Sequence, residues 1–146
     1  MARRGSAPVG RRAARKRAIE MLYEAAVRDS DPVTLLAERL GSPEVEPVAE
    51  YTATLVEGVG THLTRIDELL AEHAEGWSLQ RMPPLDLAVL RLGTYELLWA
   101  TDVPDPVAID EAVHLAKTLS TDDSPRFVNG VLGRIGGIAD QLRAVQ

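Results

Sequence analysis

The most informative absence in this chain of 146 residues is cysteine, which does not occur at all. Without thiols the chain cannot form a disulfide framework, a thiolate zinc site, an iron–sulfur cluster or a cysteine nucleophile. No apolar run approaches the roughly 18 residues that a membrane-spanning helix needs, and no apolar signal segment follows the basic start. We therefore expect a soluble, cytoplasmic protein that does not bind membranes.

Acidic residues are absent from the first 17 residues, although the whole chain has a net charge of −6. This segment holds seven arginine and lysine residues, whereas the rest of the chain carries 9 basic against 22 acidic residues. A basic segment on an acidic body is typical of a protein that holds a polyanion at one end and another partner on its body. A solvated basic tail on a solubilising acidic surface fits the same composition. The charge alone leaves both interpretations open.

Apolar residues recur at spacings of three and four along most of the chain, and no segment alternates as a strand does. Proline and glycine mark the ends of these periodic segments. With 45% hydrophobic residues and close to the roughly 150 residues of one domain, the chain is expected to form an all-α, compact single-domain bundle of about seven helices. We expect a flexible basic leader over residues 1–10 and one helical domain over residues 11–146. The predicted helices cover residues 11–28, 32–41, 51–74, 85–99, 105–119, 124–136 and 138–142, with a further turn at 78–81, and glycines at 58 and 60 leave the continuity of the third helix open.

Basic residues of the first predicted helix gather on one side of it. On a helical wheel at about 100° per residue, they and one tyrosine fall in a single arc beside the apolar stripe. These residues are Arg11, Arg12, Arg15, Lys16 and Tyr23. Arginines one turn apart can bridge successive phosphates, and a tyrosine ring offers a stacking surface to an unpaired base. The arc favours RNA binding, although Tyr23 could equally cover the edge of the core.

A second group of candidates lies at the start of the helix that follows Asp123-Ser124-Pro125. Phe127 is the only phenylalanine. It is either a core ring or an exposed ring that stacks on a base beside Arg126. Asp123 is a helix N-cap, an acceptor for a base amino group, or both. The residues alone leave both pairs of alternatives open.

No arrangement of residues indicates catalysis or a bound cofactor. Glu111 and His114 have the Glu-x-x-His spacing of di-iron bundles, but such sites need a second motif and two further carboxylates. The chain also lacks a Gly-x-Ser-x-Gly nucleophile motif and a glycine-rich loop ending in Gly-Lys-Ser/Thr. We therefore predict a protein that is not an enzyme, with no catalytic residue, no metal site and no cofactor.

Several short motifs, taken in order, resemble those of the NusB family of transcription antitermination factors. They are GRRAARKRA at residues 10–18, YELL at 95–98, VP at 103–104, IDEA at 109–112 and DSPRFVNGVL at 123–132. The resemblance implies an all-helical, non-catalytic adaptor that binds the boxA sequence of nascent ribosomal RNA together with the small-subunit ribosomal protein NusE. The complex would then join other Nus factors on RNA polymerase and support antitermination and ribosomal RNA biogenesis.

The resemblance implies RNA contacts at both groups of candidate residues. Arg11, Arg12 and Arg15 match the arginine-rich motif of the family, and Lys16 adds a charge beside them. Two further residues at the start of the predicted helix over 124–136 match positions that the family uses close to the RNA. The complete RNA-binding set that we expect is Arg11, Arg12, Arg15, Lys16, Tyr23, Asp123, Arg126 and Phe127.

The resemblance also implies a surface for NusE around Asp86, Arg91 and Glu111, where the acidic body would meet a basic ribosomal protein. The oligomeric state is left open, including a homodimer that hides the arginines until RNA or the partner displaces the second copy. The alternative function is a helical protein-interaction module whose basic leader binds acidic partners without sequence preference.

Overall fold

The computed structural model describes residues 10–44 and 46–145, which form eight α-helices and one short 3-10 helix without a β-strand. The predicted all-α fold is therefore confirmed. The predicted leader lies outside the described residues except for Gly10, so its flexibility stays a prediction. The elements are α1 (Arg11–Val27), α2 (Pro32–Gly41), α3 (Glu50–Thr61), α4 (Leu63–His73), η1 (Leu79–Arg81), α5 (Pro84–Trp99), α6 (Asp105–Leu119), α7 (Ser124–Gly137) and α8 (Ala139–Arg143).

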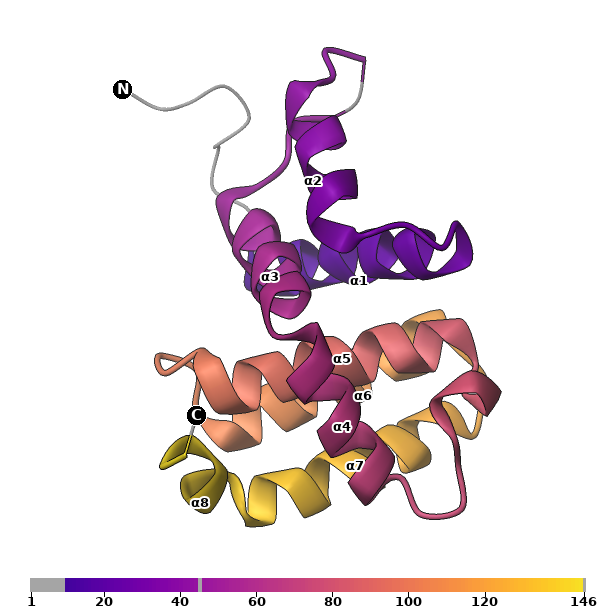
Figure 1. The fold of residues 1–146 in the computed structure, drawn as a ribbon, viewed down its shortest axis with the longest axis vertical. Helices are drawn as coiled ribbons and strands as arrows, with labels where there is room; N and C mark the ends of the chain where they lie inside the picture. The colour runs from indigo at the N-terminus through magenta and orange to yellow at the C-terminus, as the bar shows by residue number, and fades with distance from the viewer. Residues whose placement is uncertain (1–9, 45, 146) are drawn as a thin grey trace.

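Helix α5 is the centre of the bundle. It packs against α1, α3, α4, α6, α7 and α8, and most of its residues are buried. A helix surrounded in this way must be apolar on nearly every side, as the run Leu85 to Trp99 is. In Figure 1, α1, α2 and α3 form the upper part of the molecule, and α4 crosses in front of α5 and α7.

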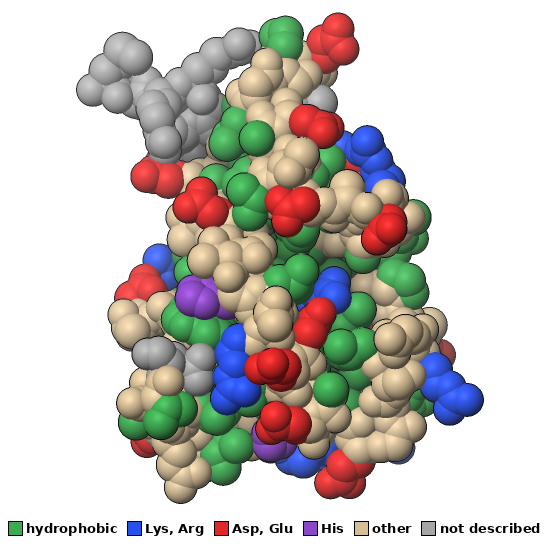
Figure 2. Space-filling view, in the orientation of Figure 1, with side chains coloured by type: hydrophobic (Ala, Val, Ile, Leu, Met, Phe, Trp, Pro, Cys, Tyr) green, Lys and Arg blue, Asp and Glu red, His purple; other side chains and the backbone are tan. Residues whose placement is uncertain are grey.

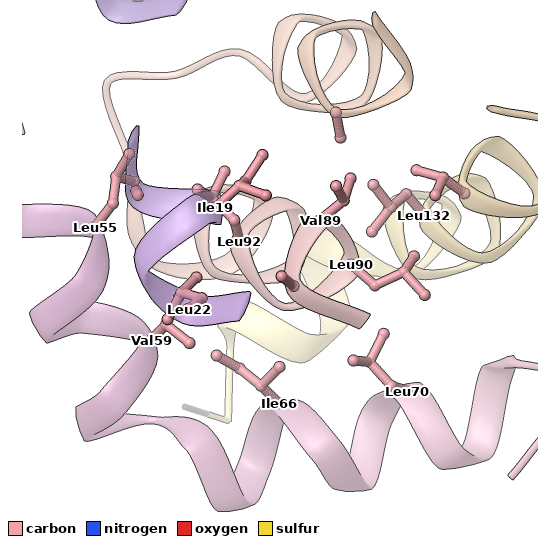
Figure 3. Packing of buried hydrophobic residues seen from close by; sticks show 14 of the residues in the cluster. Ile19, Leu22, Leu55, Val59, Ile66, Leu70, Val89, Leu90, Leu92 and Leu132 are labelled. Carbon is pink, nitrogen blue, oxygen red and sulfur yellow. The ribbon is translucent and has the colours of Figure 1, made fainter. Parts of the chain in front are cut away.

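One hydrophobic core holds the helices together. Figure 3 shows side chains from α1, α3, α4, α5 and α7 that point toward one another in its centre. Burying a leucine or isoleucine side chain contributes roughly 1.5–3 kcal/mol relative to leaving it exposed, so this core fixes the relative positions of the helices that carry the candidate site. The labelled residues are Ile19, Leu22, Leu55, Val59, Ile66, Leu70, Val89, Leu90, Leu92 and Leu132.

The helix predicted over residues 51–74 is two helices, and the break lies at His62 rather than at the glycines. His62 has φ −104° and ψ 17°, and its ring stacks on Trp99 with the centroids 4.1 Å apart. Gly58 lies inside α3, where an added Cβ would overlap the ring of Tyr95. The glycine therefore allows α3 and α5 to approach each other closely, and the split accounts for the eighth helix.

Three helices begin near an aspartate that is followed within two residues by a proline, and these aspartates behave differently from one another. Asp31 caps α2, because the amide of Thr34 donates to its carboxylate at 3.0 Å. Asp105 lies inside the first turn of α6 and pairs with Arg143. Asp123 precedes α7 with φ −86° and ψ −14°, and its side chain makes no capping hydrogen bond. Asp123 thus holds the N-cap position of α7, where its carbonyl oxygen accepts from the amide of Phe127 at 3.2 Å, but its carboxylate does not cap the helix and is available for other contacts.

Candidate nucleic-acid interface

Arg15 is buried rather than exposed on the surface of α1. Its side chain is 4% exposed, and its Nε donates to both carboxylate oxygens of Glu96, at 2.9 and 3.1 Å. Its Nη1 donates to Glu111 at 3.2 Å, and Glu96 also accepts a hydrogen bond from the hydroxyl of Tyr51. Burial acts to lower the pKa of Arg15, but the hydrogen bond and charge of Glu96 outweigh it and the pKa is raised. The guanidinium therefore stays charged inside the fold.

The other two arginines of the predicted motif are exposed and also paired. Arg11 donates to Asp102 at 2.7 Å, and its guanidinium lies 4.1 Å from the centroid of the Tyr51 ring. Arg12 binds both carboxylate oxygens of Glu111, at 3.2 and 2.7 Å. The hydrogen bond from Arg12 lowers the pKa of Glu111, although partial burial acts in the opposite direction. We call Arg11, Arg12, Arg15 and their carboxylate partners Glu96, Asp102 and Glu111 the arginine cluster.

The arginine cluster is close to neutral, because three guanidinium groups face three carboxylates. The neighbouring Arg17 is also paired, with the carboxylate of Glu46 at 3.5 Å and its carbonyl oxygen at 2.9 Å. Lys16 is exposed and has no ion-pair partner among the described residues. The basic count of the N-terminal segment therefore overstates the positive charge that α1 presents.

The remaining expected member on α1 is Tyr23. Its side chain is 38% exposed, and it is not among the partly buried residues that pack against the core. The alternative in which Tyr23 covers the edge of the core is therefore not what the structure shows. The ring is available for stacking on the surface of α1.

Asp123, Arg126 and Phe127 come together in a surface pocket at the start of α7, with a volume of about 460 Å³. Phe127 is half-buried and packs against the core, and its ring centroid lies 5.7 Å from that of Trp77, with the rings inclined by 54°. The alternative of a core ring is therefore confirmed in part, and stacking on a base stays a prediction. The side chains of Asp123 and Arg126 are exposed and have no hydrogen-bond or ion-pair partner among the described residues. We call this site the aromatic pocket, lined by Trp77, Pro83, Asp86, Thr121, Asp123, Ser124, Arg126 and Phe127.

Asp86, expected at the partner surface, is a buried residue that lines the bottom of the aromatic pocket. It is 4% exposed and accepts hydrogen bonds from the hydroxyls of Ser120 and Ser124, at 2.5 and 2.7 Å. It also sits in the first turn of α5, where the helix dipole favours a negative charge. Asp86 therefore fixes the junction of α6 and α7 against the start of α5.

The other two residues expected at the partner surface make separate contacts. Arg91 donates from Nε and Nη2 to the two carboxylate oxygens of Asp67, both at 2.9 Å, which joins α5 to α4. Glu111 belongs to the arginine cluster. The structure thus engages these residues in different interactions, and in each case part of the side chain remains exposed.

Neither a metal site nor a membrane-spanning helix is found among the described residues. No group of three His, Asp or Glu side chains in residues 10–44 and 46–145 is arranged to hold a metal ion. No helix in those ranges is both long and apolar enough to cross a bilayer. The face that carries α3 and α4 shows acidic and basic side chains interspersed, without a continuous basic patch (Figure 2).

Comparison with known proteins gives one consistent result. The model of the NusB family matches residues 12–136. The transcription antitermination protein NusB of Saccharopolyspora erythraea is 69% identical over 135 residues, which cover 92% of this chain and 91% of that protein. The structure of T. maritima NusB is 36% identical, with a TM-score of 0.76 over 90% of this chain and 93% of that one. A crystal structure of the antitermination factors NusB and NusE with double-stranded RNA includes a chain 28% identical, with a TM-score of 0.74 over 87% of this chain and 96% of that one.

Proposed function

This chain belongs to the NusB family, and we propose that it is a non-catalytic adaptor that binds boxA-type RNA of nascent ribosomal RNA transcripts together with the ribosomal protein NusE. The pair joins other Nus factors and RNA polymerase and supports transcription antitermination and ribosomal RNA biogenesis. The proposed function is carried out in the cytoplasm, where the transcripts are made.

One observation carries the proposal. The family match runs through both groups of candidate residues, from Arg12 in the arginine cluster to the aromatic pocket at the start of α7. A relative with the same fold has been crystallised with NusE and double-stranded RNA. The proposal of an unpaired RNA strand for this chain rests on its own exposed rings, because unpaired bases stack on aromatic side chains.

The exposed arginines bind RNA by exchanging their carboxylate partners for phosphates of the RNA. Arg11 and Arg12 are exposed, so a phosphate can replace the carboxylates of Asp102 and Glu111 without unfolding the helix. Lys16 contacts phosphate directly, since it has no partner to lose among the described residues. Arg15 acts through position, because its hydrogen bonds to Glu96 hold the first turns of α1 on α5.

NusE binds the body of the protein on the side of α5 and α6. Arg91 and Glu111 keep exposed edges and are the proposed contacts. Asp86 is buried and acts indirectly, because its hydrogen bonds to Ser120 and Ser124 fix the junction of α6 and α7. Because Glu111 also pairs with Arg12, a basic group of the partner that binds Glu111 would release Arg12 for the RNA. This exchange makes RNA and partner binding mutually supportive.

The test is fluorescence anisotropy with labelled boxA-type RNA and a scrambled RNA of equal length, over a salt series, with and without NusE. We expect selective binding that tightens when NusE is added. The double variant Arg11→Ala/Arg12→Ala should weaken RNA binding. It should also reduce the slope of log K against log salt concentration by at most about 0.7 for each arginine removed. Arg65→Ala, which removes a partly exposed, paired arginine from α4, is the control for the loss of one arginine.

Equal, steeply salt-dependent binding of both RNAs, unchanged by NusE, would contradict the adaptor function. It would favour the alternative, a helical interaction module with a nonspecific basic leader. Sedimentation of the free protein under the same conditions reports whether it forms a homodimer. A homodimer that dissociates when RNA is added would show that the second copy covers the RNA-binding surface.

A further inference from the structure

We propose that residues 1–9, which include Arg3 and Arg4, dock along α3 in the free protein and cover a groove there. The groove lies between α2, α3 and α5 and has a volume of about 360 Å³. Docking of this segment is intramolecular and needs neither RNA nor NusE, so it goes beyond the function proposed above. We call this site the α3 groove, with walls that include Leu40, Val48, Ala53, Glu57, His62 and Tyr95.

The first observation is that the α3 groove leaves apolar side chains open to water. Leu40 is 59% exposed, and Val48 and Ala53 are only partly buried against the core. The ring of Tyr95 lies directly against α3 at Gly58, where an added Cβ would overlap it. An apolar surface bordered by charged groups is typical of an interaction site.

The second observation is the negative charge of the groove. Among the described residues that line it, two are glutamates, Glu50 and Glu57, and none is arginine or lysine. The carboxylate of Glu57 is exposed and has no ion-pair partner among the described residues. Burial raises the pKa of Tyr95, and the nearby charge of Glu57 contributes to the rise. A guanidinium group that enters the groove can therefore pair with a carboxylate and stack on an aromatic ring.

The third observation is the place where residues 1–9 join the fold. Arg11, the first residue of α1, lies over the ring of Tyr51 near the start of α3, 4.1 Å from the ring centroid. Nine extended residues span at most about 30 Å, whereas the 12 residues of α3 rise about 18 Å. The segment is therefore long enough to follow the groove from the start of α3 to its end.

The composition of residues 1–9 complements the groove. The segment MARRGSAPV has two arginines, no acidic residue, and small or apolar residues on both sides of the arginines. Exposed ion pairs are weak individually, so a free peptide of this sequence would bind poorly. The covalent tether raises the effective concentration of the segment to the order of millimolar. Pairing of its arginines in the groove lowers the positive charge that the protein offers to other polyanions.

The test is paramagnetic relaxation enhancement in the full-length, ¹⁵N-labelled protein with a spin label on Ala2→Cys. The chain has no native cysteine, so the label attaches at one position. We expect the amide signals of Thr54, Glu57 and Thr61 to lose most of their intensity, and those of α7 to keep theirs. Raising the salt concentration should restore the lost signals, because the ion pairs are screened.

Charge variants show whether the arginines and the groove cause this loss. The double variant Arg3→Ala/Arg4→Ala should restore the signals of Glu57 and Thr61, and Glu57→Gln should do the same. Glu75→Gln removes an equal charge from an exposed side chain beyond the end of α4, which has no ion-pair partner among the described residues. This matched control should leave the signal losses unchanged.

Three results would overturn the proposal. Losses that persist in both charge variants would show that the tether alone brings the label near α3. Losses centred on Asp102 instead of Glu57 would place the segment on another surface. Losses that appear in ¹⁵N-labelled protein without a label, when spin-labelled protein is added, would show that the groove binds residues 1–9 of a second copy. None of these results bears on the RNA-binding function, which the anisotropy titrations test separately.

Discussion

The arginine cluster and the aromatic pocket contrast in how their charged groups are partnered. In the arginine cluster, every guanidinium of the predicted motif binds a carboxylate of the same chain. In the aromatic pocket, the side chains of Asp123 and Arg126 have no hydrogen-bond or ion-pair partner among the described residues. The arginines that dominate the charge pattern of the sequence are thus already neutralised by carboxylates. The side chains of Asp123 and Arg126, which the charge pattern does not single out, are available to a ligand.

This difference indicates how the two regions contribute to binding. A phosphate that binds Arg11 or Arg12 must displace a carboxylate, so the net gain per contact is small and decreases with salt. In the aromatic pocket, the side chains of Asp123 and Arg126 have no ion-pair partner among the described residues that a ligand must displace. We therefore expect the pocket to supply selectivity among RNA sequences. The arginine cluster should supply a salt-dependent attraction, whose strength depends on whether the carboxylates of Asp102 and Glu111 are bound to Arg11 and Arg12 or to another cation.

The buried member of the arginine cluster gives the largest expected effect. Glu96→Ala leaves the guanidinium of Arg15 buried without its main partner, and removing one member of a buried pair costs about 3–5 kcal/mol. The free energy of unfolding, measured by urea denaturation, should fall by this amount. The loss reflects a charge left without a partner as well as the contact that is removed.

Asp102→Ala is the control for Glu96→Ala, because it removes a carboxylate from the exposed end of the same cluster. Arg11 remains in water when Asp102 is lost, so the stability should change far less. Equal losses for the two variants would show that burial does not distinguish Arg15 from Arg11. The assignment of Arg15 as a positioning residue would then be wrong.

Helix positions could be predicted from the sequence because they depend on local patterns. The apolar spacing placed α1, α2, α5, α6 and α7 within a residue or two of their observed ends. The break between α3 and α4 could not be predicted in the same way. It lies at His62, whose ring stacks on Trp99 of α5, and a contact with another helix leaves no trace in the local pattern.

The capping of α7 illustrates a second limit. Asp31 and Asp123 stand in similar sequences, but Asp31 is extended, with φ −73° and ψ 131°, whereas Asp123 has helical angles. Only the extended residue can turn its carboxylate back to the helix amides. The residue type was therefore informative about where α7 begins, and uninformative about what the side chain of Asp123 does.

The sequence names candidate site residues but does not reveal which partners they contact in the fold. The helical wheel places Arg15 beside the apolar stripe, but the wheel contains one helix and cannot show that Glu96 lies 81 residues away in sequence and contacts it. Trp77 was missed because it lies between α4 and η1, where no periodicity assigns it to a face. Its membership of a very small aromatic set was the only signal that could have found it.

Breaking the exposed pair of Arg12 and Glu111 should have a smaller effect, and this effect is a gain in RNA affinity. Glu111→Gln removes the charge that holds Arg12, so RNA should bind the protein without NusE more tightly, by at most about fivefold. Asp110→Asn changes the net charge equally at an exposed neighbour that has no ion pair among the described residues. If both variants tighten binding equally in anisotropy titrations, the gain comes from net charge and the release of Arg12 is not its cause.

The smallest expected effect is a pH dependence of stability at Glu111. The hydrogen bond from Arg12 lowers the pKa of this carboxyl below its ordinary value of 4.5, so the ionised form is favoured in the folded state. Its contribution is therefore complete above pH 4.5 and is lost as the pH falls through the lower pKa of the folded protein. The free energy of unfolding of Glu111→Gln, measured by urea denaturation, should lie below that of the wild type at neutral pH and approach it in acid. Other carboxyls, such as Glu24, titrate in both proteins and cancel in the difference. A difference that stays constant down to strongly acidic pH would mean that the Glu111 charge does not stabilise the fold.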